Sequence, residues 1–236
     1  MAFARVQGLG AENDSSSSTV AVTITAVGSG NAICGIVSCP SGATITSVMD
    51  DKGNTYNLET SVVDTFEGQR SAAFSLTNIT NAPTVITGTI SSNQSFKKII
   101  VDEFSGGSTA SSDERDGSAH GGQYQSSPGT GTDGITSGTF TTTNNGDLLW
   151  GGCIGASNTT LASTGTSFST GSSQATSYAG QTEYRVQTTA GSGTAATLTQ
   201  AGNVGRMTFL IALKAPSAAA ASLIFVPNPM KHMLIR

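Results

Sequence analysis

The sequence contains little charge, since Asp, Glu, Lys and Arg make up 11% of its 236 residues. Ordinary soluble domains carry roughly 25%, and here Ser, Thr, Asn and Gly supply the polar surface instead. The formal net charge is −4, so the chain lacks the basic face with which nucleic-acid-binding proteins displace counterions. We therefore expect no nucleic-acid partner, and a surface suited to a fixed assembly or to the outside of a cell.

Long apolar runs are also missing. No stretch approaches the roughly 18 residues of a membrane span, so we expect no membrane partner. Met1–Glu12 has one arginine but lacks the apolar core of a signal peptide. This predicts a protein made in the cytosol and not secreted by a signal peptide.

Residues that commonly carry chemistry are few. The three cysteines, Cys34, Cys39 and Cys153, lack a metal-binding spacing, and we expect them to be reduced, small core residues. The two histidines, His120 and His232, lie in a Gly/Ser-rich segment and near the C-terminus, and no GxSxG motif is present. We expect neither a Ser-His-Asp triad nor a cofactor, and we interpret the chain as a non-enzyme.

The chain is rich in short segments that alternate apolar and small polar residues. Thr19–Ala26 (TVAVTITA) is typical, because its β-branched residues alternate with the period of a half-buried strand. Gly, Asn and Ser separate such segments at a regular spacing. The pattern predicts an all-β fold, an antiparallel β-sandwich of jelly-roll type with about ten to twelve short strands. Phe96–Phe104 (FKKIIVDEF) is the most apolar strand of its half and is expected to be central.

Two segments, residues 1–18 and 106–136, lack this alternating pattern. Residues 1–18 lack periodicity and end in four serines, so we expect an extended N-terminal arm. Residues 19–215 form the predicted sandwich domain, which contains a long Gly/Ser-rich loop over 106–136. Roughly thirty residues without apolar periodicity exceed an ordinary connection, which indicates a functional loop or a segment ordered by a partner.

Residues 216–236 form a C-terminal tail that is both apolar and basic. Leu223–Arg236 reads LIFVPNPMKHMLIR, and its prolines prevent a regular central strand. The tail either packs on its own sandwich or docks on a neighbouring subunit. Under the second alternative, eight apolar residues bind the partner: Leu223, Ile224, Phe225, Val226, Met230, Met233, Leu234 and Ile235.

The order of several motifs resembles a known family of β-sandwich domains. The motifs are SVMDDKGNTYNLE (Ser47–Glu59), FSLTNITNAPTVITGTI (Phe74–Ile90), IIVDEFSG (Ile99–Gly106), TSGTFTTTNNGDLLWGG (Thr136–Gly152) and MTFLIALKA (Met207–Ala215). Such domains occur in bacteriophage virion proteins and in bacterial extracellular proteins. The resemblance covers roughly Thr19 to Ala215, and its motifs are structural ones that close hairpins and begin strands.

The resemblance implies a virion structural protein of a bacteriophage. The expected role is a decoration or cement protein on the head exterior, or a tail or fibre component. Its partners would be other virion proteins and further copies of itself. A carbohydrate-binding, lectin-like module that binds a surface glycan is one alternative, and a β-sandwich glycan hydrolase is another.

A hydrolase would need two carboxylates that meet in space. Asp102 and Glu103 are adjacent on one predicted strand, so their side chains point to opposite faces. Glu103 with Glu183, or Glu103 with Asp147, remain possible pairs. The favoured interpretation is that these carboxylates satisfy turns or pair with Arg185 or Lys97.

Two acidic clusters suggest cation sites. Asp50, Asp51 and Asn54 supply oxygen ligands of the kind calcium prefers, but Asp-Asp-Lys-Gly-Asn is equally good hairpin chemistry. The second cluster contains Asp113, Glu114 and Asp116 around Arg115, and a solvated loop is the favoured interpretation.

Aromatic residues would support sugar binding if they were exposed in a row. The candidates are Tyr124, Trp150, Phe168, Tyr178 and Tyr184. Trp150 lies in the apolar segment LLWGGCI and is expected to be a core residue.

Overall fold

The fold is known from a computed structural model. It describes residues 2–59, 61–65, 68–116, 121–125, 134–136, 141–155, 161–163, 167–175, 179–191, 197–200 and 206–216. These residues form seventeen strands and no helix, and all strand pairs are antiparallel. The predicted all-β sandwich is confirmed, with more strands than the ten to twelve expected. The described part of the chain contains no helix that would span a membrane.

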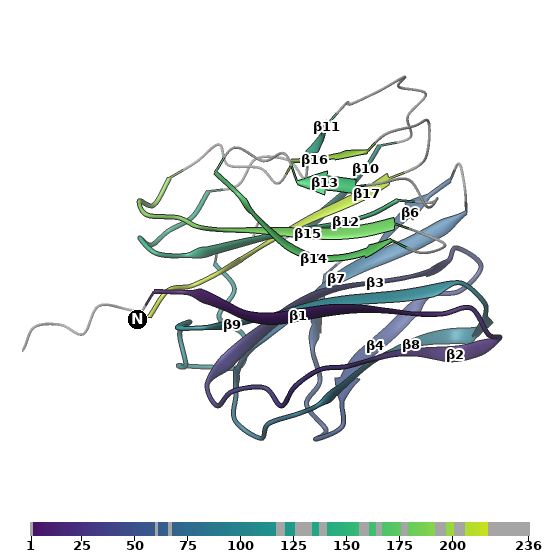
Figure 1. Cartoon of the computed structure of the whole chain (residues 1–236), viewed down its shortest axis with the longest axis horizontal. Coiled ribbons are helices and arrows are strands. Elements are labelled where there is room, and N and C mark those ends of the chain that lie inside the picture. Colours follow the sequence, from purple (N-terminus) through teal and green to yellow (C-terminus); the bar gives the residue numbers. More distant parts are fainter. Residues whose placement is uncertain are drawn as a thin grey trace, which may run out of the picture.

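Four sheets are stacked as layers (Figure 1). Sheet A is an inner layer with the order β1 (Ala4–Asn13), β9 (Lys97–Ser105), β3 (Asn31–Pro40), β7 (Gln69–Ile79) and β5 (Asn57–Leu58), and β6 (Val62–Asp64) also pairs with β7. Sheet B has the order β2 (Ser17–Thr23), β8 (Val85–Gln94) and β4 (Ile45–Asp50).

Sheets C and D lie on the other side of sheet A (Figure 1). Sheet C has the order β10 (Gly121–Gln125), β17 (Arg206–Leu213), β12 (Leu148–Gly155), β15 (Ala179–Val186) and β14 (Ser169–Ala175). Sheet D has the order β11 (Gly134–Thr136), β16 (Thr197–Gln200) and β13 (Leu161–Ser163). The simple pair of sheets expected from the sequence is therefore extended by further layers.

The inner strands of sheet A, β9, β3 and β7, are buried on both faces, and each face contributes to a separate hydrophobic core. The core against sheet B includes Ile33, Ile99 and Val101, whereas the core against sheet C includes Ile100 and Phe104. A strand with two buried faces needs apolar residues at successive positions. This explains the composition of β9 and confirms its predicted central position.

The sandwich begins earlier in the chain than expected. Residues 1–18, predicted to be an extended arm, contain β1 and the first residues of β2. β1 pairs with β9 from Ala4 to Asn13, so this segment belongs to the fold of its own chain. The pattern was missed because β1 is an edge strand with glycines at positions 8 and 10 in place of alternating apolar residues.

The predicted loop over 106–136 also contains secondary structure. β10 pairs with β17 and β11 pairs with β16. Before them, Asp116 N donates to Ala212 O and Lys214 N donates to Glu114 O at 2.9 and 2.8 Å. This part of the segment therefore runs beside the end of β17 as an added strand-like edge.

Several predicted core residues are where the sequence placed them. Trp150 is fully buried in the core between sheets A and C. Cys34, Cys39 and Cys153 are buried and form no disulfide, and burial is the main reason why the pKa of the Cys39 thiol rises to about 11. They are inert core residues at neutral pH.

Candidate functional site

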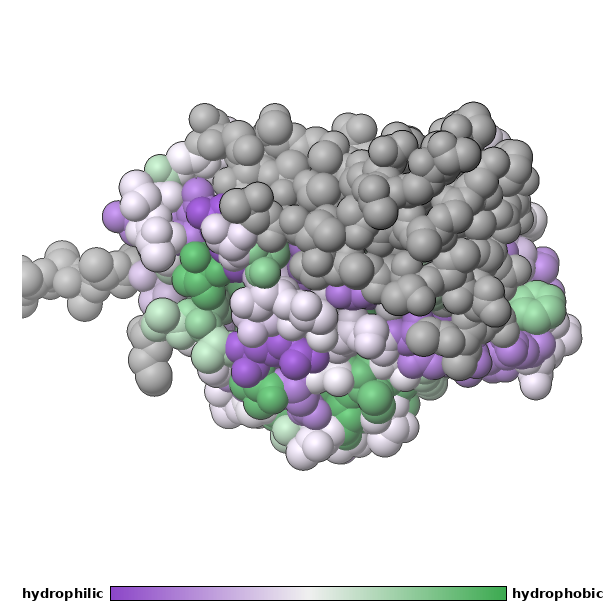
Figure 2. Space-filling model, turned by 45° about the horizontal axis from the view of Figure 1, so that its top comes forward, coloured by the Kyte–Doolittle hydropathy of each residue, from purple (hydrophilic) through white to green (hydrophobic). Residues whose placement is uncertain are grey.

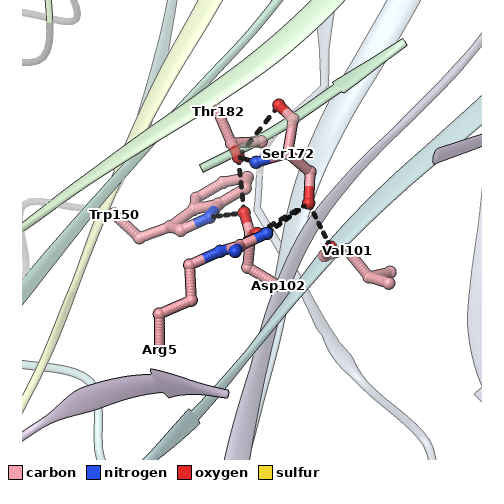
Figure 3. A network of polar contacts seen from close by, with 6 residues as sticks. All are labelled: Arg5, Val101, Asp102, Trp150, Ser172 and Thr182. Atoms are coloured by element: carbon pink, nitrogen blue, oxygen red, sulfur yellow. Dashed lines mark hydrogen bonds and ion pairs between the residues drawn. The ribbon is translucent and has the colours of Figure 1, made fainter. Parts of the chain in front are cut away.

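A buried carboxylate, Asp102 of β9, joins sheets A and C (Figure 3). Its Oδ1 accepts from Arg5 Nε and from Ser172 Oγ, both at 2.8 Å. Its Oδ2 accepts from Trp150 Nε1 at 2.9 Å and from Thr182 Oγ1. The partners come from β1, β12, β14 and β15, so one side chain links four other strands.

Glycines allow these groups to approach each other closely. Gly8 lies opposite Asp102 in the pairing of β1 with β9. A Cβ at Gly8 would lie 2.2 Å from Ser172 Oγ and 2.3 Å from Asp102 Oδ1. A Cβ at Gly171 would lie 2.2 Å from Thr182 Oγ1. We call Arg5, Asp102, Trp150, Ser172 and Thr182 the Asp102 network, and both glycines are required by its compactness.

Glu103 points to the opposite face of the same strand, as the sequence predicts. Its Oε1 accepts from Gly28 N at 2.8 Å and from Asn31 Nδ2 at 2.5 Å, and its Oε2 accepts from Gln7 Nε2 at 2.5 Å. Glu103 therefore closes the loop between β2 and β3. This agrees with the predicted role of a carboxylate that satisfies a turn, and the alternative partner Lys97 donates to Ser15 O and Gln94 O instead.

The two carboxylate pairs considered for a hydrolase are not assembled. Glu183 is buried in the middle of sheet C, opposite Gly151 and Thr170, whereas Glu103 faces away from that sheet. Asp147 lies before β12, where its Oδ1 accepts from Ala215 N at 2.7 Å and its Oδ2 from Asn144 N at 2.9 Å. The carboxylic partner of Asp147 is Asp116, to which it is hydrogen-bonded.

Asp116 and Asp147 form a buried pair that shares a proton. The pKa of Asp147 is raised to about 6, mainly by burial and also by the neighbouring Asp116 carboxylate, against the lowering effect of the backbone donors Ala215 N and Asn144 N. Burial also acts to raise the pKa of Asp116. Hydrogen bonds donated by Thr143 Oγ1, Thr143 N and Asp147 have the larger combined effect and hold that pKa below its usual range. The pair can hold or release one proton near neutral pH.

The acidic cluster around Arg115 is not a solvated loop, contrary to the sequence interpretation. Arg115 forms two hydrogen bonds to Asp113, at 2.6 and 2.7 Å, and one to Glu59 at 2.8 Å. Asp116 is fully buried. The segment is therefore fixed to sheet A through Glu59 and to the region before β12 through Asp116.

The calcium candidate is built as a hairpin turn. Asp50 Oδ1 accepts from Lys52 N and Asn54 N at 3.0 Å, and Asp50 Oδ2 accepts from Asn54 Nδ2 at 2.7 Å. Asp51 instead accepts from Thr84 N at 2.9 Å, and this bond is the main cause of its low pKa, about 2. The two carboxylates thus serve different segments, and within the described residues no cluster of three or more His, Cys, Asp or Glu residues could hold a metal.

The aromatic residues do not form an exposed row where they are described. Trp150 is in the core, and Phe168 packs on the buried residues Leu149, Leu210 and Ala212. Tyr184 is half-buried and packs edge-on against Phe104 with ring centroids 5.3 Å apart. Tyr184 also lines an open hollow of about 470 Å³, whose other lining residues are Ser167, Ser169, Arg185, Val186 and Thr188.

One side of the sandwich consists of edge strands. β2, β1 and β14 end sheets B, A and C, and β1 packs against both of the others. On β1, Val6 and Leu9 are 53% and 50% exposed. Val6 is the extra residue of a bulge between Arg5 and Gln7. Figure 2 shows apolar areas among hydrophilic ones on the visible described surface.

Several predicted positions fall outside the described residues. These are His120, Tyr178, His232 and the tail residues Leu223, Ile224, Phe225, Val226, Met230, Met233, Leu234 and Ile235. The side chain of Tyr124 is likewise not described. The roles predicted for them stay predictions.

Sequence reasoning missed most of the Asp102 network. Arg5 was assigned to an arm, and Ser172 and Thr182 are two hydroxyl residues among many. The sequence signal that could have located the network is a pair of glycines, Gly8 and Gly171, at strand positions where side chains of other strands approach the backbone closely. Comparisons with family models, with curated proteins and with solved structures gave no match.

Proposed function

We propose that this chain is a non-enzymatic structural subunit of a bacteriophage virion. Its role would be to decorate or cement the head exterior, or to form part of a tail or fibre. The motifs from Ser47 to Ala215 support this proposal through their resemblance to domains of such proteins. A sandwich held by internal polar contacts is a suitable rigid body for an assembled particle.

The observation that carries the proposal is the edge at β1, where sheet A ends among the described strands. An unpaired edge strand with exposed apolar side chains invites main-chain pairing with another chain. Monomeric proteins usually protect such an edge with charged side chains, proline, a bulge or a covering loop, and the bulge at Val6 affects only the start of β1. β1 contains neither lysine nor proline, and half-exposed Val6 and Leu9 lie along it. Such a surface suits a protein whose working state is an assembly.

The test is the association state of the full-length protein. Sedimentation velocity at micromolar concentrations should show a defined oligomer, and negative-stain images should show the protein bound to particles of the phage that encodes it. A protein that stays monomeric at high concentration and does not bind those particles would contradict the proposal.

Glycan binding is the second candidate, favoured by the hollow beside Tyr184 and Arg185. An accessible part of a tyrosine ring, a guanidinium and the hydroxyls of Ser167 and Ser169 are groups that contact sugars. Glycan-array binding that is lost in Tyr184→Ala but retained in Met49→Ala would support this candidate. A blank array would remove it.

A further inference from the structure

We propose that the open edge of β1 is the docking site for the tail segment Leu223–Val226 of a second copy of this chain. The segment would add to sheet A as an extra strand. This inference rests on the proposed assembly function, and it names the surface and the partner. The argument depends on the edge, on the place where the described chain ends, and on the composition of the tail.

The edge is long and open. Sheet A ends at β1 in the described part of the chain, and β1 pairs with β9 along ten residues, Ala4–Asn13. In an antiparallel strand, the main-chain groups of alternate residues point away from the existing partner. They are available to an added strand, which binds by main-chain hydrogen bonds and by pockets for alternate side chains.

The described chain ends beside the start of this edge. Pro216 lines a hollow of about 450 Å³ together with Ala2, Ala4 and Ser105. Leu223 follows Pro216 by seven residues, so it lies at most about 25 Å from this hollow. β1 is about 34 Å long at 3.4 Å per residue. The tail therefore starts near one end of its own β1, and it can extend from there to the β1 edge of a copy that associates at this side.

Strand direction favours the adjacent copy. A tail that runs directly from the hollow along its own β1 would be parallel to it, because both start at the same end. Every described strand pair in this protein is antiparallel, and parallel pairs are slightly less stable per residue. A second copy can present β1 in the opposite direction and accept the tail as an antiparallel strand.

The composition of the tail matches a strand of the inner sheet. Leu223–Val226 reads LIFV, which is apolar on both faces, as are β3 and β9, which are buried on both faces. A strand with one face in water would alternate. An addition to β1 would be flanked by β2 and β14, which pack against β1 from sheets B and C. Pro227 lacks an N–H and ends the added strand after four residues.

A disulfide-trapping experiment on the full-length protein tests this geometry. The double variant Leu9→Cys/Phe225→Cys places one thiol on the edge and one in the tail, while the three native cysteines are buried and do not compete. Mild oxidation should give covalently linked pairs of chains. The matched control is Met49→Cys/Phe225→Cys, since Met49 is 42% exposed on β4, the opposite edge of sheet B. The control should stay uncrosslinked.

Charge substitutions provide a second measurement. Full-length Leu9→Lys should self-associate at least tenfold more weakly than the parent protein, because a lysine on an edge opposes strand addition. Met49→Lys should associate as the parent does. If Leu9→Lys unfolds, as a melting curve would show, the cysteine pair decides the question.

The outcomes separate the docking site from the proposed function. If truncation after Ala221 weakens association but Leu9→Lys does not, the tail docks elsewhere, so the inference fails while the assembly function stands. If the disulfide forms within one chain, the tail completes its own sheet and the inference also fails. If full-length and truncated proteins are both monomeric, the inference and the assembly function fail together.

Discussion

The two faces of β9 carry the same kinds of residue and use them differently. Towards sheet B, the strand presents Lys97, apolar Ile99 and Val101, and then Glu103. Towards sheet C, it presents Lys98, Ile100, Asp102 and Phe104. All eight side chains are buried. Each face therefore has a lysine near its start, an acid near its end and apolar residues beside them.

The two faces differ in the groups that form hydrogen bonds with these charged side chains. On the sheet B face, most partners lie in loops or at strand ends. Lys97 donates to the carbonyls of Ser15 and Gln94, and Glu103 accepts from Gly28, from Asn31 and from Gln7 within β1. On the sheet C face, side chains from four strands surround Asp102, and within the described residues Lys98 Nζ has no hydrogen-bond partner. The first face closes loops, whereas the second fastens one sheet to the next.

The largest effect is expected at the acid of the sheet C face. Asp102→Ala should lower the free energy of unfolding by about 3–5 kcal/mol, because it leaves Arg5, Trp150 and Thr182 without their acceptor in a buried interface. Glu103→Gln, the matched change on the other face, should lower the free energy of unfolding by about 1–2 kcal/mol, since the amide oxygen of glutamine still accepts hydrogen bonds. Urea unfolding measures both, and equal losses would contradict the distinction between the faces.

The lysines should show effects of opposite sign. Burial is the main cause that lowers the pKa of Lys98 to about 8. Lys98→Met should therefore raise the free energy of unfolding at pH 7 by about 2–3 kcal/mol, because it removes an unpartnered buried amine. Lys97→Met should lower it by about 1 kcal/mol, because two carbonyls lose their donor.

The pH dependence identifies the cause of the Lys98 effect. The unfolded lysine keeps its proton to about pH 10.4, so between pH 8 and 10 the unfolded state binds more protons and stability rises with pH. The parent protein should therefore melt at a higher temperature at pH 9 than at pH 7. Loss of this rise in Lys98→Met would support the assignment, and its persistence would contradict it.

A smaller effect is expected at the pair of buried acids away from β9. Asp147 keeps its proton to about pH 6 in the folded protein, whereas the unfolded carboxyl loses it near pH 4. The folded state thus binds more protons between these values, and stability should fall by about 1–2 kcal/mol as the pH rises from 4 to 6. Asp116, with its lowered pKa, contributes the opposite slope below pH 4.

The Asp147→Asn variant tests this interpretation. An asparagine stays neutral and still donates a hydrogen bond to Asp116, so the decrease in the free energy of unfolding between pH 4 and 6 should disappear. Melting temperatures at pH 4.5 and 7 measure it. An unchanged decrease would assign the pH dependence to other carboxylates.

The sequence predicted those parts of the fold that depend on local pattern. Period-two alternation located β2, and the apolar composition of Phe96–Phe104 located β9. The turn residues at Asp50–Asn54 located a hairpin that the structure confirms through the Met49–Thr55 bridge. Trp150 was assigned correctly to the core from its apolar neighbours.

Other parts depend on distant contacts and left little local signal. β1 reads ARVQGLGAEN without alternation, because its glycines allow close approach to β14 and its edge position does not require a continuous apolar face. The partners of Asp102 lie as much as 97 residues away in sequence. A pairing such as Asp116 with Asp147 depends on tertiary placement, which residue spacing does not encode.

The pairing of β1 with β9 also affects how the chain folds. Arg5 forms a hydrogen bond with Ser172 across 167 residues, so the first strand to be synthesised completes its contacts only after most of the chain has been made. Bringing the ends of so long a loop together costs conformational entropy before the stabilising contacts form. Folds dominated by such pairings therefore fold slowly. Sheet B and the β3–β7 pair join strands that lie closer together in sequence, so we expect them to form earlier. We therefore expect the N-terminal strand to be the last piece of sheet A to pair, with β9 as the open edge of the newly made chain until then.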